Sequence, residues 1–140
     1  TGTFVSVGPM RAKAIMAGSP YVQDVVLTGL NMKEVGALIF PTPACREVSG
    51  LGADASMNEV LASTPVRQRI QAIIDQLARE STGSASRIAR ALVLAEPPSP
   101  VLGEITDKGS VNQRAVLKHR AALVDALHDG SATGIYTPQA

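Results

Sequence analysis

Two apolar segments separated by a short polar turn constrain the fold of this chain more than any other feature. Residues 22–28 (VQDVVLT) and 35–40 (VGALIF) are rich in β-branched residues, and Gly29-Leu30-Asn31 begins the turn between them. This spacing is typical of an antiparallel β-hairpin. Pro41 has no backbone N–H to donate, so the second strand should end there. We therefore predict a β-hairpin over residues 22–40.

Helical patterns lie on both sides of this hairpin. Thr64 and Pro65 form a helix start, and apolar side chains then recur at helical spacing to Leu77. Ser110 and Gln113 have the spacing of a capping box for a final helix that ends near Gly130. Further predicted elements are strands over 3–7 and 87–95, a helix over 10–17, and a loop over 49–63 with a helical turn near 58–61.

The order of these elements, β-α-β-β-α-β-turn-α, predicts an α+β fold. Such a domain has a small sheet of three or more strands covered by helices. The length of 140 residues fits one domain. We expect residues 1–130 to form this domain and residues 131–140 to be a flexible tail. Because the chain starts at Thr1 without a Met, we also expect it to be part of a longer polypeptide.

Composition argues against several classes of function. A net charge of +1 and 3% aromatic residues leave neither a basic stripe nor stacking platforms, so we expect no nucleic-acid partner. No apolar run approaches the roughly 20 residues of a membrane span, so we expect no membrane partner. The one cysteine, Cys45, permits no internal disulfide and fits a cytoplasmic protein. His119 and His128 lack metal-ligand spacing, so we expect surface histidines and no metal site.

Lys108 is the strongest candidate for chemistry. It lies in Ile105-Thr106-Asp107-Lys108-Gly109-Ser110, between a proline-rich stretch and a capped helix. A long cationic side chain on such a turn can reach a separate site. One ammonium group near a phosphate oxygen is worth roughly 4 kcal/mol at an effective dielectric of 20. A turn lysine by itself is, however, most often a solvated surface residue.

Four stretches together resemble the C-terminal domain of adenylate-forming enzymes, which include acyl-CoA synthetases. GEITDKGSVNQRAVLKHRAALVDAL, residues 103–127, resembles the last motif of feruloyl-CoA synthases. TGTFVSVGPMRAKA at the start is similar to the segment after the interdomain hinge of that superfamily. YVQDVVLTGLNMKEVGALIFP resembles its central hairpin, and ALVLAEPP its next strand. The resemblance covers about residues 1–129.

This resemblance implies an ATP-dependent acid–CoA ligase. A carboxylate, ferulate or a similar aromatic acid, would be activated as acyl-adenylate and then transferred to CoA. The cofactors would be ATP, CoA and Mg²⁺, and the partner would be an N-terminal adenylation domain outside this chain. Lys108 would be the adenylation lysine, although the family's common run has the lysine after a glycine and here Gly109 follows it. Residues that would border the CoA channel are Gly2, Thr3, Phe4, Val35 and Gly36.

Three interpretations remain open from the sequence. The first is the small domain of an acid–CoA ligase, inactive when separated from its partner domain. The second is a stand-alone, non-enzymatic module that binds a ligand or a partner, and the third is a structural remnant without chemistry. Gly2 and Gly36 fit equally well as ordinary turn or bulge glycines. The identity of the acid and the oligomeric state are not encoded in any of these motifs.

Overall fold

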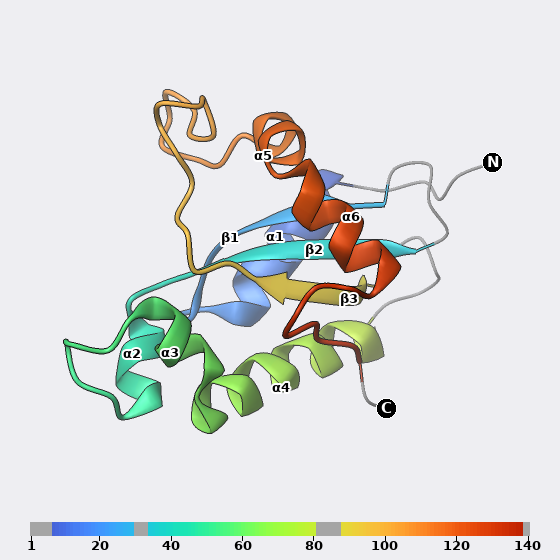
Figure 1. The fold of residues 1–140 in the computed structure, drawn as a ribbon. Coiled ribbons are helices and arrows are strands. Elements are labelled where there is room, and N and C mark those ends of the chain that lie inside the picture. The colour runs from blue at the N-terminus through green and yellow to red at the C-terminus, as the bar shows by residue number, and fades with distance from the viewer. Residues whose placement is uncertain (1–6, 30–33, 81–87, 139–140) are drawn as a thin grey trace.

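The structure is a computed structural model that describes residues 7–29, 34–80 and 88–138. The strand predicted over residues 3–7 lies largely outside these ranges, and Val7 already begins a helix. Figure 1 shows the elements in chain order. They are α1 (Val7–Gly18), β1 (Val22–Thr28), β2 (Val35–Pro41), α2 (Ala44–Ser49), α3 (Met57–Ala62), α4 (Thr64–Glu80), β3 (Ile88–Val93), α5 (Gln113–His119) and α6 (Ala121–Asp129).

The described strands form one three-stranded sheet with β2 in the middle. β1 and β2 pair antiparallel, with Val25 opposite Ile39 and Leu27 opposite Ala37, so the predicted hairpin is confirmed. β3 pairs parallel with β2, with Ala37 opposite Ala91. Parallel neighbours require a long crossover connection, and the segment that contains α2, α3 and α4 provides it.

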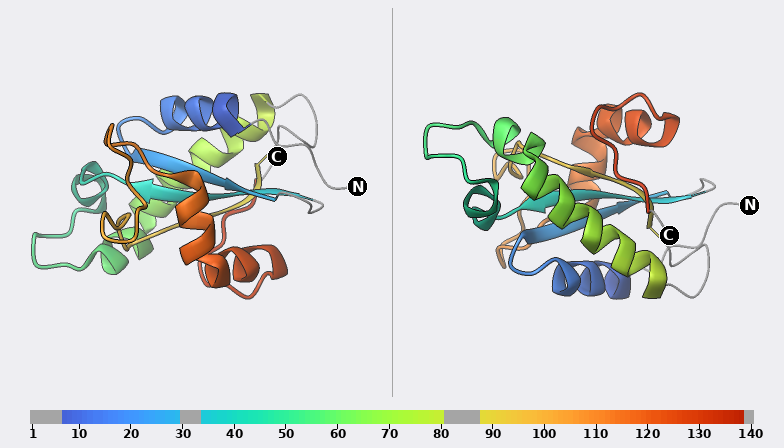
Figure 2. Two further views of the ribbon diagram at one scale, coloured as in Figure 1. Left: turned by 90° about the horizontal axis from the view of Figure 1, so that it is seen from above. Right: turned by 90° about the horizontal axis from the view of Figure 1, so that it is seen from below.

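Both faces of the sheet are covered, which explains why β2 is apolar along its whole length. Val35, Ala37 and Ile39 face a core built with α1 and α4. The alternate residues Leu38 and Phe40 face a second core built with α5 and α6. Figure 2 shows the two helical layers on opposite sides of the strands. The predicted α+β fold with a small helix-covered sheet is confirmed.

α4 is the helix that the sequence predicts best. It begins at Thr64 and runs to Glu80, close to the expected bounds. Each fully buried aliphatic side chain contributes about 1.5–3 kcal/mol, so the apolar stripe of α4 contributes on the order of 10 kcal/mol before conformational entropy is counted. The stripe consists of Val66, Ile70, Ile73, Ile74 and Leu77.

The loop predicted over residues 49–63 contains more helix than expected. α3 is capped by Ser56, whose hydroxyl accepts a hydrogen bond from the N–H of Glu59, while the Glu59 carboxylate accepts one from the N–H of Ser56. α2, which the sequence did not predict, ends at Ser49 and is followed by the C-cap Gly50 in the left-handed conformation with φ 74°. Helices of six residues are too short to show a helical period, so packing rather than pattern determines them.

The final helix differs from the prediction in its start and in its continuity. Its N-cap is Asn112, whose side chain accepts a hydrogen bond from the N–H of Ala115. The expected capping box fails because both of its residues have other partners: the Ser110 hydroxyl bonds to Thr106 and the Gln113 amide bonds to Leu27. The helix also breaks at Arg120, which separates α5 from α6.

Part of the segment predicted as a flexible tail is packed against the sheet. Tyr136 exchanges two backbone hydrogen bonds of 2.8 Å with Ala91 of β3, and its side chain is only 3% exposed. The guanidinium of Arg67 lies 4.3 Å from the centre of the Tyr136 ring. This aromatic contact and the backbone pairing attach the segment to α4 and β3.

Candidate functional site

Lys108 lies at the tip of a loop formed by residues 99–112, which we call the lysine loop. The N–H of Gly109 donates to the carbonyl of Thr106 at 2.9 Å, and the N–H of Thr106 donates to the carbonyl of Ser110 at 2.7 Å. Gly109 has φ 82°, the left-handed conformation that closes a three-residue hairpin loop of this kind. The turn therefore requires glycine directly after Lys108, which accounts for the Lys-Gly order.

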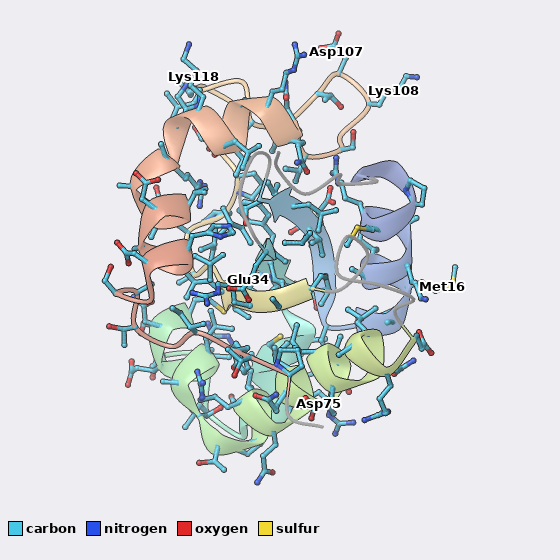
Figure 3. The ribbon with its side chains drawn as sticks, turned by 90° about the vertical axis from the view of Figure 1, so that its right-hand side faces the viewer. Met16, Glu34, Asp75, Asp107, Lys108 and Lys118 are labelled. Atoms are coloured by element: carbon cyan, nitrogen blue, oxygen red, sulfur yellow. The ribbon has the colours of Figure 1, made fainter. Side chains whose placement is uncertain are left out.

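The side chain of Lys108 is exposed and available. Figure 3 shows Lys108 and Asp107 pointing away from the sheet into solvent. Within residues 7–29, 34–80 and 88–138, no hydrogen bond or ion pair engages the Lys108 amine. An unpaired ammonium group on a protruding turn can approach a phosphate or carboxylate that another domain holds. The role of Lys108 in catalysis stays a prediction.

A buried ion pair holds the first leg of the lysine loop. Glu104 is 1% exposed and accepts two hydrogen bonds from the Arg120 guanidinium, at 2.9 and 3.1 Å. Arg120 also donates to the carbonyls of Glu96 and Pro97 and lies 5.1 Å from the centre of the Phe40 ring. The Arg120 hydrogen bonds hold the pKa of Glu104 below its ordinary value, so this carboxylate is ionised at neutral pH. Removing one partner of such a buried pair costs about 3–5 kcal/mol.

A second ion pair holds the other leg of the loop. The Asp24 carboxylate accepts hydrogen bonds from Arg11 at 2.8 Å and from the backbone N–H of Val111 at 3.1 Å. Arg11 also donates to the carbonyl of Val111 at 3.1 Å. The next turn of chain is fixed by Gln113, whose amide makes hydrogen bonds of 2.7 and 3.0 Å with the backbone of Leu27. Both ends of the lysine loop are therefore attached to the domain.

The sequence indicated these anchoring residues only weakly. Asp24 is a charged residue directly before the apolar run Val25-Val26-Leu27, a pattern that signals a buried polar contact. Glu104 and Arg120 are separated by sixteen residues and belong to a turn and to a helix break. No local pattern connects them, because their pairing depends on the path of the loop between them.

Of the residues predicted to border a CoA channel, the structure describes Val35 and Gly36, and it does not bring these two next to Lys108. Gly2, Thr3 and Phe4 lie outside the described residues. Val35 is fully buried in the core beneath α1 and α4, with 0% of its surface exposed. Figure 3 shows its neighbour Glu34 well apart from Lys108.

Gly36 faces the opposite side of the sheet, where α6 packs closely. A β-carbon built on Gly36 would collide with the Thr28 hydroxyl and would lie 3.0 Å from Leu127 and 3.2 Å from His128 Nε2. His128 Nε2 itself lies 2.6 Å from the Thr28 hydroxyl oxygen. In this structure the glycine permits α6 to approach β2, which is the packing role that the sequence left open.

His128 is half-buried rather than a surface residue as expected. Burial, and next the charge of Arg90, lower the pKa of His128, so its neutral form is favoured. The carbonyls at the end of α6 are instead satisfied by Arg90, which donates to those of Leu127 at 2.9 Å and His128 at 3.0 Å. Arg90 also forms an ion pair with Glu34 at 3.1 Å. His119, in contrast, is exposed.

Other kinds of site have little support in the described part of the chain. No group of three or more His, Cys, Asp or Glu residues lies close enough there to hold a metal ion. None of the helices among these residues has both the length and the apolar character of a membrane-spanning segment. Cys45 is buried, and burial raises the pKa of its thiol, so it lacks the character of a nucleophile.

Comparisons with known proteins agree with the fold. Two solved structures from Segniliparus rugosus are similar: the A domain of carboxylic acid reductase in complex with AMP and a co-purified carboxylic acid, and the A-PCP didomain of that enzyme with AMP. Their TM-scores are 0.60 and 0.62, and their identities of 19% and 17% support a shared fold alone. The matches cover 91% and 92% of this chain but only 18% and 17% of the reductase chains.

The sequence itself matches a family model, whereas no curated protein matches it. The model describes the C-terminal domain of AMP-binding enzymes, and it covers residues 5–132, which include the hairpin, both helical layers and the lysine loop. The chain therefore belongs to the family of AMP-binding enzyme C-terminal domains, the small domain of adenylate-forming enzymes.

Proposed function

We propose that this chain is the C-terminal domain of an AMP-forming acid–CoA ligase and that Lys108 assists formation of the acyl-adenylate. The observation that carries the proposal is the unpaired, exposed Lys108 amine at the tip of a loop anchored on both legs. The family membership supports activation of a carboxylate with ATP. Transfer to CoA and an aromatic acid such as ferulate are supported by the resemblance of residues 103–127 to feruloyl-CoA synthases.

In the first step the carboxylate oxygen attacks the α-phosphorus of ATP, and the bond to pyrophosphate breaks. Negative charge shifts onto the bridging and leaving oxygens as the acyl-phosphate bond forms. A cation that contacts these oxygens more strongly in the transition state lowers the barrier. Lys108 is suited to supply this cation because its amine has no partner among the described residues.

The remaining components of the reaction belong to a partner domain. Within the described residues there is no cluster of metal ligands, and Lys108 is a single cation rather than a phosphate-binding loop. We therefore assign ATP, Mg²⁺ and the carboxylate mainly to an N-terminal adenylation domain. In the second step the CoA thiol attacks the acyl carbonyl and AMP leaves. Gly2, Thr3, Phe4 and the backbone near Val35 and Gly36 remain our candidates for the CoA channel.

One alternative concerns the acceptor of the acyl group. The similar A domains belong to a carboxylic acid reductase, and one of them was solved with a PCP domain. The thiol of a carrier protein is thus a second candidate acceptor. The other alternative, a non-enzymatic binding module, would not activate any acid.

The test uses the full-length protein that contains this domain. It measures acid-dependent exchange of pyrophosphate into ATP with ferulate, coumarate and benzoate, followed by thioester formation with CoA. We expect exchange with at least one aromatic acid and a CoA thioester as product. Exchange without CoA thioester would favour a carrier-protein acceptor, and absence of exchange with aromatic and aliphatic acids would refute the ligase assignment.

A further inference from the structure

We infer that Glu104 and Arg120 form a positioning pair that orients Lys108 for adenylation. The inference rests on the proposed role of Lys108 and extends it to two residues that do not themselves meet the substrate. Both side chains are buried, with 1% of Glu104 and 9% of Arg120 exposed, and both lie at the base of the lysine loop. Lys108 lies four residues beyond Glu104, at the tip.

The pair connects three separate stretches of backbone. Arg120 donates to the carbonyl of Glu96 at 3.0 Å and to that of Pro97 at 2.8 Å, just before the loop begins. Glu104 accepts a hydrogen bond of 2.8 Å from the N–H of Ser99, at the start of the loop. Arg120 itself lies in the break between α5 and α6. One ion pair therefore fixes the start of the loop relative to both helices.

The orientation of the base determines the orientation of the tip. Above Glu104 the two legs are joined by the bridge between Ile105 and Val111 and by the hydrogen bond of 2.9 Å between the Thr106 and Ser110 hydroxyls. The tip is thus a short closed ribbon, and its rotation follows the rotation of its base. Because Lys108 is solvent-exposed, the direction of its backbone is set by these anchors rather than by contacts at the tip.

A buried ion pair is well suited to orienting the lysine loop and poorly suited to stabilising the fold. A buried ion pair contributes little more to folding than an apolar pair of the same volume. A bidentate pair between guanidinium and carboxylate, however, fixes both distance and direction. Direction matters here, because a displacement of about 1 Å of a catalytic group can lower the rate about a hundredfold.

The test uses Glu104→Gln in the full-length protein, with the aromatic acid that the wild type activates fastest. This variant keeps the shape of the side chain and removes its charge. We expect the kcat of adenylation to fall about 10- to 100-fold, with KM for ATP changed less than about twofold. Pre-formed acyl-adenylate should react with CoA at the wild-type rate. Arg120→Lys, which keeps the buried charge and loses the fork geometry, should lower adenylation in the same selective way.

Controls separate positioning from folding. Glu80→Gln removes a carboxylate from an exposed ion pair with Lys13, remote from the loop, and should leave both half-reactions unchanged. Glu104→Gln combined with Lys108→Ala should adenylate no more slowly than Lys108→Ala alone, because Glu104 acts through Lys108. Thermal unfolding of each variant shows whether it folds. If Glu104→Gln does not, Arg120→Lys decides the question with the same two half-reactions.

The outcomes distinguish this inference from the function on which it rests. Wild-type adenylation by Glu104→Gln, with slow adenylation by Lys108→Ala, would overturn the positioning role and leave the proposed function intact. An equal loss in both half-reactions would also overturn it, since the pair would then support only the fold. Wild-type adenylation by Lys108→Ala would remove the proposed role of Lys108 and this inference together.

Discussion

Replacing Gly36 with alanine tests whether this glycine is needed for packing between β2 and α6. The new methyl group would collide with the Thr28 hydroxyl and crowd Leu127 and His128. Overpacking of a buried site costs about 1–3 kcal/mol. Separation of Thr28 from His128 would remove a hydrogen bond worth about 1 kcal/mol. Alanine also restricts the unfolded chain more than glycine does, and this raises the free energy of unfolding by about 0.4–1 kcal/mol.

The net expectation is that Gly36→Ala lowers the free energy of unfolding by about 1–3 kcal/mol, which corresponds to roughly 3–9 °C in Tm for a domain of this size. Chemical and thermal unfolding followed by circular dichroism would measure both quantities. Gly52→Ala is the matched control, because a β-carbon there meets nothing within 4 Å, and it should not lower stability. An unchanged unfolding midpoint for Gly36→Ala would refute the packing role and favour a ligand-binding role for this glycine.

Three further predictions concern the lysine, the isolated domain and pH. Lys108→Ala in the full-length protein should slow adenylation about 100- to 1,000-fold and leave thioester formation from acyl-adenylate unchanged. Lys118→Ala, at another exposed lysine, is the control and should change neither step. Equal slowing of both steps by Lys108→Ala would contradict this prediction. The 140-residue chain alone should catalyse no pyrophosphate exchange with aromatic acids, and acid-dependent exchange would disprove that. Burial lowers the pKa of His128, so its contribution to stability is fully present above the ordinary value of 6.5 and declines as pH falls below that value. His128→Gln should flatten that decline, and an unchanged slope would argue against His128 as its source.

The sequence predicted those parts of the fold where local pattern and tertiary packing agree. The hairpin and α4 have long apolar repeats and clear end signals, and the structure places both close to the expected bounds. α2 and the N-cap of α5 were missed because tertiary contacts, and not the local pattern, determine them. Asn112 competes with Ser110 as a cap, and the choice depends on Gln113 reaching across to Leu27, a contact between residues 86 positions apart.

Of the candidate site, the sequence identified the lysine but not the residues that anchor its loop. A lysine on a turn next to glycine could be identified from local sequence, and the structure places this lysine on an exposed turn. Its anchors could not be identified, because Arg120 lies inside the segment that the sequence predicted as one final helix. Arg120 lies at the break between α5 and α6 and pairs there with Glu104, a contact that exists only once the loop has folded.

The contacts at the two outer strands have a consequence for association between copies of the chain. A three-stranded sheet has two edges whose free backbone groups can pair with another sheet and start aggregation. On the β3 edge, Ala91 is already paired with Tyr136. On the β1 edge, the Gln113 side chain occupies the N–H and the carbonyl of Leu27. Gln113, which helps to anchor the lysine loop, therefore also blocks pairing at Leu27 on the β1 edge, while Tyr136 blocks it at Ala91 on the β3 edge.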